Sequence, residues 1–167
     1  MERVSNILER LSNLLLILFM ILLGISTTLQ VVSRFVIRSP LVWTEEVSRM
    51  SFIWIAFLGS TVAVKHQKHM ALDFLFAKLA PRPASLLRAT THIMMGVVAV
   101  VFLLAGWEFV LKNVGRISET TGVPMILLYI AAQLSGGLML FYLVEQAPAL
   151  CEKLRDAWRG KMGGKKL

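Results

Sequence analysis

Three long uncharged stretches dominate the pattern of hydrophobic and polar positions along the chain. Residues 11–33 give 23 consecutive positions without a formal charge, residues 120–144 give 25, and residues 89–107 give 19, among which His92 is the one ionisable side chain. A helix needs about 20 such residues to cross a hydrocarbon core of about 30 Å. The pattern therefore predicts three membrane-spanning helices.

A fourth spanning helix is predicted where the uncharged run is shorter, because residues 50–64 number only 15. Extended back to Thr44, the segment has 21 residues. At ~1.5 Å per residue it is then about 32 Å long, enough to span. The second helix therefore crosses only if Glu45, Glu46 and Arg49 belong to its first turns.

These segments predict an all-α membrane protein with four transmembrane helices and no soluble domain. The expected parts are an interfacial amphipathic segment at 1–10, a domain at 11–150 with helices at 11–36, 44–65, 86–112 and 122–146, an interfacial helix at 70–80, and a basic tail at 151–167. Both interfacial segments place apolar residues at i, i+3, i+4 and i+7. Pro124 suits the first turn of the fourth helix.

Composition agrees with this layout. The chain is 56% hydrophobic with a mean hydropathy of +0.69, above the roughly 45–50% apolar share of soluble domains. The predicted side that holds both termini and the middle loop carries 13 Lys and Arg residues against 5 on the other side. Both termini are therefore expected to be cytoplasmic. The net charge of +8 is spread over membrane-flanking loops, so no nucleic acid is expected as a partner.

The charges that open the second helix share one side of it. Counted from Trp43 at about 100° per residue, Glu45 falls at about 200°. Arg49 follows at about 240° and Glu46 at about 300°, whereas Trp54 lies on a separate face. The charged arc continues into small residues, which let helices approach closely in lipid. These small residues are Ala56, Ser60 and Ala63.

Three interpretations of this arc stay open. A charge at the bilayer centre costs about 2.5–3.5 kcal/mol and less towards the interface. The charges could simply form an intrahelical pair, Glu45 with Arg49 or Glu46 with Arg49. The interpretation we favour adds that the face packs against another membrane protein or helix. Direct binding of a transported ion or substrate is the third, but the pattern offers no broken helices at the membrane midplane.

Other polar and small residues inside the spans also indicate helix packing. Gly136 and Gly137, with Ala132 and Ser135, are typical of a close helix contact in the fourth helix. The outer half of the first helix is polar enough that we expect it to meet protein or the headgroup zone. Its polar residues are Ser26, Thr27, Thr28, Gln30 and Ser33.

The histidines raise a second kind of chemistry. His66, His69 and Asp73 stand at i, i+3 and i+7, but solvation at the membrane interface explains them without a metal. With His92, a bis-histidine haem is conceivable, which would make the chain a membrane anchor of a redox complex. No nucleophile, base and acid combine by spacing, and Cys151 has no disulfide partner. We expect neither an enzyme nor a cofactor or metal.

Four stretches resemble one family, the DctQ-like small membrane subunits of tripartite ATP-independent periplasmic (TRAP) transporters. They are VVSRFV at 31–36, WTEEVSRMSFIWIAFLGSTVAV at 43–64, HMALDFL at 69–75 and GVPMILLYIA at 122–131. The second stretch is the most specific. The residues that match are Trp43, Glu45, Glu46, Arg49, Trp54 and Gly59, followed by His69 and Asp73.

The resemblance implies a multi-pass protein of the bacterial inner membrane that works with two partners. These are a large DctM-like membrane subunit, which carries the sodium and substrate sites, and a periplasmic solute-binding protein. The small subunit would be a scaffold that also contacts membrane lipids, and none of its matching residues would bind substrate.

Because the chain ends at a basic tail, unlike fused members of the family, the large subunit is expected to be a separate chain. The implied substrate is an organic acid, such as a C4-dicarboxylate or a sialic acid. A stand-alone four-helix transporter is the remaining alternative.

Overall fold

The computed structural model describes residues 2–66, 81–118 and 120–158, and this part of the chain is almost entirely helical. The elements are α1 (Glu2–Val32), the π-helix η1 (Ser33–Ile37), α2 (Val42–His66), α4 (Pro81–Lys112) and α5 (Ile126–Trp158). The four α-helices are all long and apolar enough to cross a membrane. The predicted all-α protein with four transmembrane helices is therefore confirmed, whereas the cytoplasmic location of its termini stays a prediction.

The first helix begins earlier than expected. α1 runs without a break from Glu2, so residues 2–10 of the predicted segment are continuous with the spanning helix. No glycine or proline interrupts the chain before Gly24, and nothing in the backbone favours a stop at residue 10. Its position in the membrane interface stays a prediction. At its other end α1 passes into η1, which Arg38 terminates in the left-handed conformation with φ 57°.

Prolines lie at or near the other helix ends that differ from expectation. α4 starts at Pro81, ahead of the expected residue 86, because proline is well suited to the first helical position. Pro124, predicted inside the first turn of the last helix, instead precedes that helix, in an isolated β-bridge with Ile117. α5 begins only at Ile126 and continues through Pro148 to Trp158, beyond the expected end at 146. The predicted interfacial helix at 70–80 lies outside the described residues.

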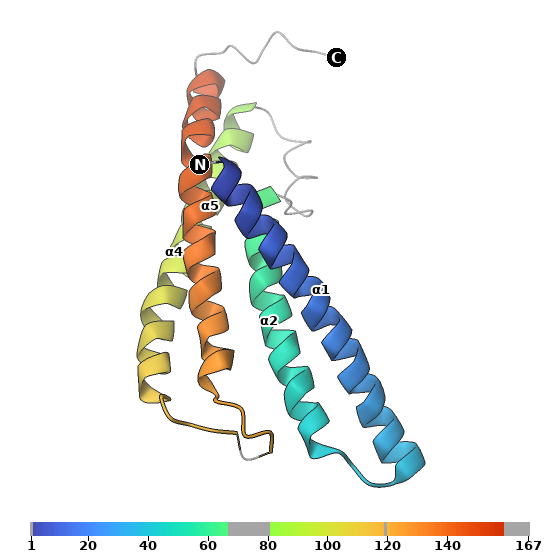
Figure 1. Cartoon of the computed structure of the whole chain (residues 1–167). Coiled ribbons are helices and arrows are strands. Elements are labelled where there is room, and N and C mark those ends of the chain that lie inside the picture. The colour runs from blue at the N-terminus through green and yellow to red at the C-terminus, as the bar shows by residue number, and fades with distance from the viewer. Residues whose placement is uncertain (1, 67–80, 119, 159–167) are drawn as a thin grey trace.

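The helices pack in an open row. α1 packs on α2, α2 on α5 and α5 on α4, and no comparable contact joins α1 to α4 within the described ranges. Figure 1 shows this order, with α2 and α5 in the middle. The α1/α2 pair forms one helical hairpin and the α4/α5 pair forms the other. α2 and α5 are the second helices of these hairpins, so they run in the same direction. We call the end with the 33–41 and 113–125 connections the hairpin end, and the opposite end the terminal end.

Small hydroxyl side chains fill the contact between α1 and α2. The buried positions of α1 and the start of η1 recur at intervals of seven or fourteen, a spacing typical of left-handed helix pairs. They are Ser5, Ser12, Ser26 and Ser33. Phe19 occupies the missing position and stacks on Trp54 with ring centroids 5.3 Å apart. Among the polar residues of the outer half of the first helix, Ser26 and Ser33 therefore meet protein, whereas Thr27 and Thr28 are exposed and bond their own helix backbone.

A small apolar core lies where α2, α4 and α5 meet. Its buried members are Val64, Ala99, Met139, Tyr142 and Leu143. Most other large apolar side chains are exposed, as expected for a protein whose surroundings are hydrocarbon rather than water. Gly136 belongs to this region, because a Cβ on it would lie 3.2 Å from the Ala99 carbonyl oxygen, whereas Gly137 has nothing within 4 Å. The expected close contact is thus made by Gly136 and not by Gly137.

Candidate subunit interface

The two glutamates that open α2 make different contacts. The Glu45 carboxylate lies 3.1 Å from the Arg49 guanidinium, one helical turn away, and both side chains are more than 60% exposed. Such an exposed pair at i and i+4 contributes only a few tenths of a kcal/mol, about 0.3–0.5. Of the two possible intrahelical pairs, the structure forms the one with Glu45.

Glu46 instead joins α2 to the 113–125 connection. Its Oε2 accepts hydrogen bonds from the hydroxyls of Thr120 and Thr121, the latter at 3.1 Å. Ser118 shapes this turn, because its Oγ accepts the backbone N–H groups of both threonines at 3.2 Å. Gly122, with φ 68°, lets the chain reverse there. A residue far along the sequence therefore partners Glu46, and no spacing rule predicts this contact.

An open pocket of about 610 Å³ lies beside Glu46, between the start of α2 and the 113–125 connection. Glu45, Glu46 and Arg49 line it from α2, and Arg116 and Tyr129 line the opposite side. Two acidic and two basic side chains leave it without a dominant charge. The pocket sits at the hairpin end rather than in the middle of the spans, so it does not have the midplane position of a transport site.

The rest of the predicted arc of α2 is largely uncovered. Thr44, Ser48 and Ser51 of α2 are buried inside the protein. Ala56 is exposed, and Ser60 and Ala63 are half-buried. The arc of Glu45, Arg49, Ala56, Ser60 and Ala63, which we call the α2 strip, therefore faces away from the α1 contact.

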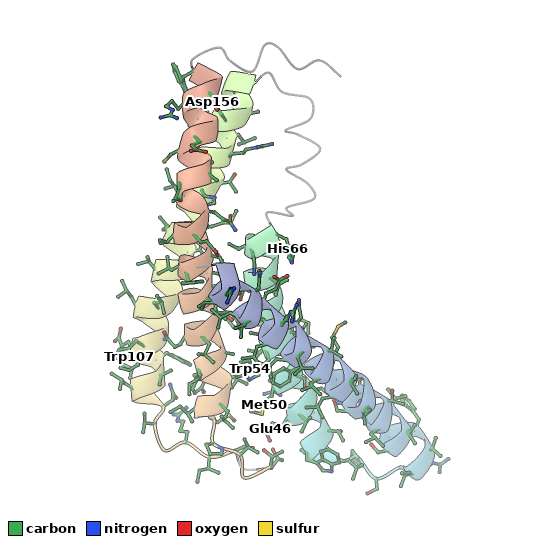
Figure 2. All side chains as sticks on the ribbon, turned by 45° about the horizontal axis from the view of Figure 1, so that its top comes forward. Glu46, Met50, Trp54, His66, Trp107 and Asp156 are labelled. Carbon is green, nitrogen blue, oxygen red and sulfur yellow. The ribbon has the colours of Figure 1, made fainter. Side chains whose placement is uncertain are left out.

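The other predicted interface residues are placed as follows. Trp43 is 42% exposed at the start of α2, and a Cβ added to Gly59 would meet nothing within 4 Å. Trp54 does not join the strip, because it stacks on Phe19 of α1. Figure 2 labels Glu46, Met50 and Trp54 along the hairpin-end half of α2 and His66 at its other end. His69 and Asp73 lie outside the described residues.

A second polar cluster lies at the terminal end, where the sequence pattern predicts none. The Lys65 ammonium lies 2.7 Å from Glu9 of α1 and 5.3 Å from the ring centre of Tyr142 in α5. The Gln146 amide donates to the carbonyl oxygens of Val64 and Lys65, at 3.2 and 3.0 Å, near the end of α2. The signal in the sequence is a pair of opposite charges just outside two apolar runs, but only packing shows that they meet.

This cluster also bears on the haem alternative. His66 Nε2 lies 2.7 Å from Glu9, so that nitrogen already has a partner. His92 Nε2 is buried without a hydrogen-bond partner in the described part of the chain. The described residues hold no group of three or more potential metal ligands. The haem alternative stays untested, because His69, the other proposed partner of His92, lies outside the described residues.

Comparisons with known proteins agree with the fold. The family described as tripartite ATP-independent periplasmic transporters, DctQ component, matches residues 23–151. A putative TRAP transporter small permease protein of Haemophilus influenzae is 29% identical over 146 residues, 87% of this chain and 91% of the relative. The ectoine TRAP transporter small permease protein TeaB of Halomonas elongata is 24% identical over 129 residues, 76% of this chain and 67% of the relative.

A third relative is much longer. The sialic acid TRAP transporter permease protein SiaT of H. influenzae is 43% identical over 58 residues, which are 35% of this chain but only 9% of that protein. The fold thus defines a multi-pass membrane protein, and the family match places it in the bacterial inner membrane. The chain belongs to the DctQ-component family of TRAP transporters, and it is a transporter subunit rather than an enzyme.

Proposed function

We propose that this chain is the scaffold subunit of a sodium-coupled TRAP importer of an organic acid. It holds a large DctM-like membrane subunit in place and works with a periplasmic solute-binding protein. The termini lie in the cytoplasm, so the hairpin end faces the periplasm. The chain does not transport by itself.

The observation that carries this proposal is the open row of helices. A stand-alone transporter encloses its substrate site between helices near the midplane. Here α1 and α4 stay apart at the two edges of the row, and the described pocket lies at one end. Within the described residues, such a row offers broad faces to other membrane proteins.

The α2 strip is the proposed contact with the large subunit. Charged groups at a membrane interface are best kept where protein or headgroups surround them. Small side chains at Ala56, Ser60 and Ala63 allow a helix of the partner to approach closely. The longer relative SiaT supports a partnership with a large permease, since this chain matches only a short part of that protein. The names of the relatives support small solutes as substrates, sialic acid and ectoine among them.

Reconstitution tests the proposal. The product of the neighbouring open reading frame is co-expressed with this chain, and we expect the two to purify together. Proteoliposomes that contain both, supplied with the binding protein, should take up the organic acid under a sodium gradient. Full uptake by the large subunit without this chain would refute the scaffold role, and uptake by this chain alone would favour a stand-alone transporter.

A further inference from the structure

The two helical hairpins of this chain are held together unevenly. The α1/α2 hairpin meets the α4/α5 hairpin mainly where α2 packs on α5. At the terminal end, Lys65 lies over the Tyr142 ring, and Gln146 donates to two carbonyl oxygens of α2. The apolar core contributes there as well, because Val64 packs with Tyr142. This end therefore combines packing, ring and hydrogen-bond contacts.

Fewer contacts join the two hairpins at the hairpin end than at the terminal end. Figure 1 shows the two hairpins diverging towards this end. The open pocket of about 610 Å³ lies there, between the start of α2 and the 113–125 connection. Thr120 and Thr121 donate side-chain hydrogen bonds across it to Glu46, whose carboxylate also lies near the Ser118 hydroxyl. The nearest ring contact between the hairpins is farther along the helices, where Phe57 meets Phe102.

Only one of the two carboxylate oxygens of Glu46 accepts hydrogen bonds. Its Oε2 accepts both threonine hydroxyls, but its Oε1 is buried and has no hydrogen-bond partner among the described residues. A buried acceptor without a partner costs free energy that water or another donor would recover. Ser118 Oγ accepts the backbone N–H groups of both threonines and so orders this turn. Forming the threonine contacts with Glu46 therefore requires little further ordering of the loop. The closed arrangement is therefore favoured by two bonds and opposed by one unsatisfied oxygen.

We propose that Glu46, Thr120 and Thr121 form a latch that sets how far the two hairpins spread at the hairpin end. The contacts at the terminal end act as the hinge. With the latch closed the hairpins stay together, and with it open they separate while the hinge contacts remain. A hydrogen-bond donor from a partner that reaches Oε1 would favour the closed state. This inference concerns the chain itself and stands whether or not the proposed transport function is correct.

Distance measurements on the full chain in lipid nanodiscs test the latch. In a Cys151→Ser background, spin labels are placed at Phe35→Cys and Val114→Cys, both exposed and one on each hairpin at the hairpin end. A second pair, Ile7→Cys and Leu86→Cys, reports on the terminal end. Double electron–electron resonance then gives the distance distribution of each pair.

Glu46→Ala should add a longer-distance population at the hairpin end and leave the terminal-end distribution unchanged. The ratio of open to closed molecules should rise at least about tenfold, since either one of the two hydrogen bonds lost to this charged group is worth about that factor. The double variant Thr120→Val, Thr121→Val should reproduce the change. It replaces Glu46→Ala as the test if that variant fails to fold, because Thr120 lies on an exposed turn where a substitution disturbs folding less.

Glu45→Ala is the matched control, since the neighbouring glutamate pairs only with exposed Arg49 in the described structure. It should leave both distributions as they are. Unchanged distances in the Glu46 and threonine variants would overturn the latch, and so would an equal opening caused by Glu45→Ala.

Discussion

Lys65 and Glu9 form an ion pair of 2.7 Å between the end of α2 and the first turns of α1, with side chains only 14% and 20% exposed. The same ammonium donates to the Ser5 carbonyl oxygen at 2.8 Å and lies over the ring of Tyr142. One side chain thus connects α1, α2 and α5. Because it is largely shielded, this pair should matter more than the exposed pairs of the chain.

Lys65→Met tests the importance of this connection. The substitution keeps most of the length of the side chain but leaves His66 as the one remaining side chain in contact with the Glu9 carboxylate in the described structure. We expect a loss of about 1–3 kcal/mol in the free energy of unfolding, because a shielded carboxylate loses its charged partner. Thermal unfolding in detergent measures it. The control is Lys112→Met, which breaks the exposed pair with Glu108 and should change stability by about 0.5 kcal/mol or less. Equal effects of the two variants would contradict the prediction.

The hydroxyl contact between α1 and α2 leaves no room for larger side chains. Ser26 is 2% exposed, and its Oγ lies 2.8 Å from the Ser48 Oγ. Ser26→Leu should push the helices apart and cost about 1–3 kcal/mol, as overpacking usually does. Thr27→Leu, at the exposed neighbouring position, should be tolerated. The yield of monodisperse protein and its melting temperature in detergent are the measurements. A stable Ser26→Leu protein would show that the contact is looser than described.

Two adjacent glycines of α5 should respond differently to the same change. A Cβ on Gly136 would meet the Ala99 carbonyl oxygen at 3.2 Å, and backbone cannot easily yield. Gly136→Ala should therefore destabilise the α4/α5 contact by about 1–3 kcal/mol. Gly137→Ala meets nothing within 4 Å and should be neutral or stabilising by up to about 1 kcal/mol, since alanine favours helix. If both variants melt at the same temperature, Gly136 is not the contact point.

The α2 strip can be tested by assembly. Arg49→Ala leaves Glu45 without its partner on the surface proposed to meet the large subunit, and the yield of the co-purified complex should fall severalfold. Lys112→Ala is the matched control, because it breaks the Glu108 pair, which has the same i,i+4 spacing and similar exposure but lies on α4. Pull-down of the large subunit through a tag on this chain gives both yields. Equal losses would argue against the α2 strip as the specific contact.

The lengths of the apolar runs were enough to predict the number and kind of the spanning helices. Four segments are long and apolar enough to span, and no alternative structure satisfies the backbone of such segments in a membrane. The need to lengthen the second span also placed Glu45, Glu46 and Arg49 inside a helix, where α2 has them. Helix ends were less accurate: α4 starts at Pro81, which suits a first helical position, and α5 continues through Pro148 although an interior proline removes a backbone hydrogen bond.

Which of these residues meet depends on the packing of different helices against one another. The three charges lie on one arc of α2, yet Glu45 bonds within the helix and Glu46 reaches Thr120 and Thr121 more than seventy positions away. Lys65 and Glu9 are likewise visible in the sequence only as charges that flank apolar runs, and the packing of α1 on α2 brings them together. Periodicity describes one helix at a time, because it depends on the geometry of that helix alone. The order α1, α2, α5, α4 and its two polar clusters depend on how side chains of different helices fit together.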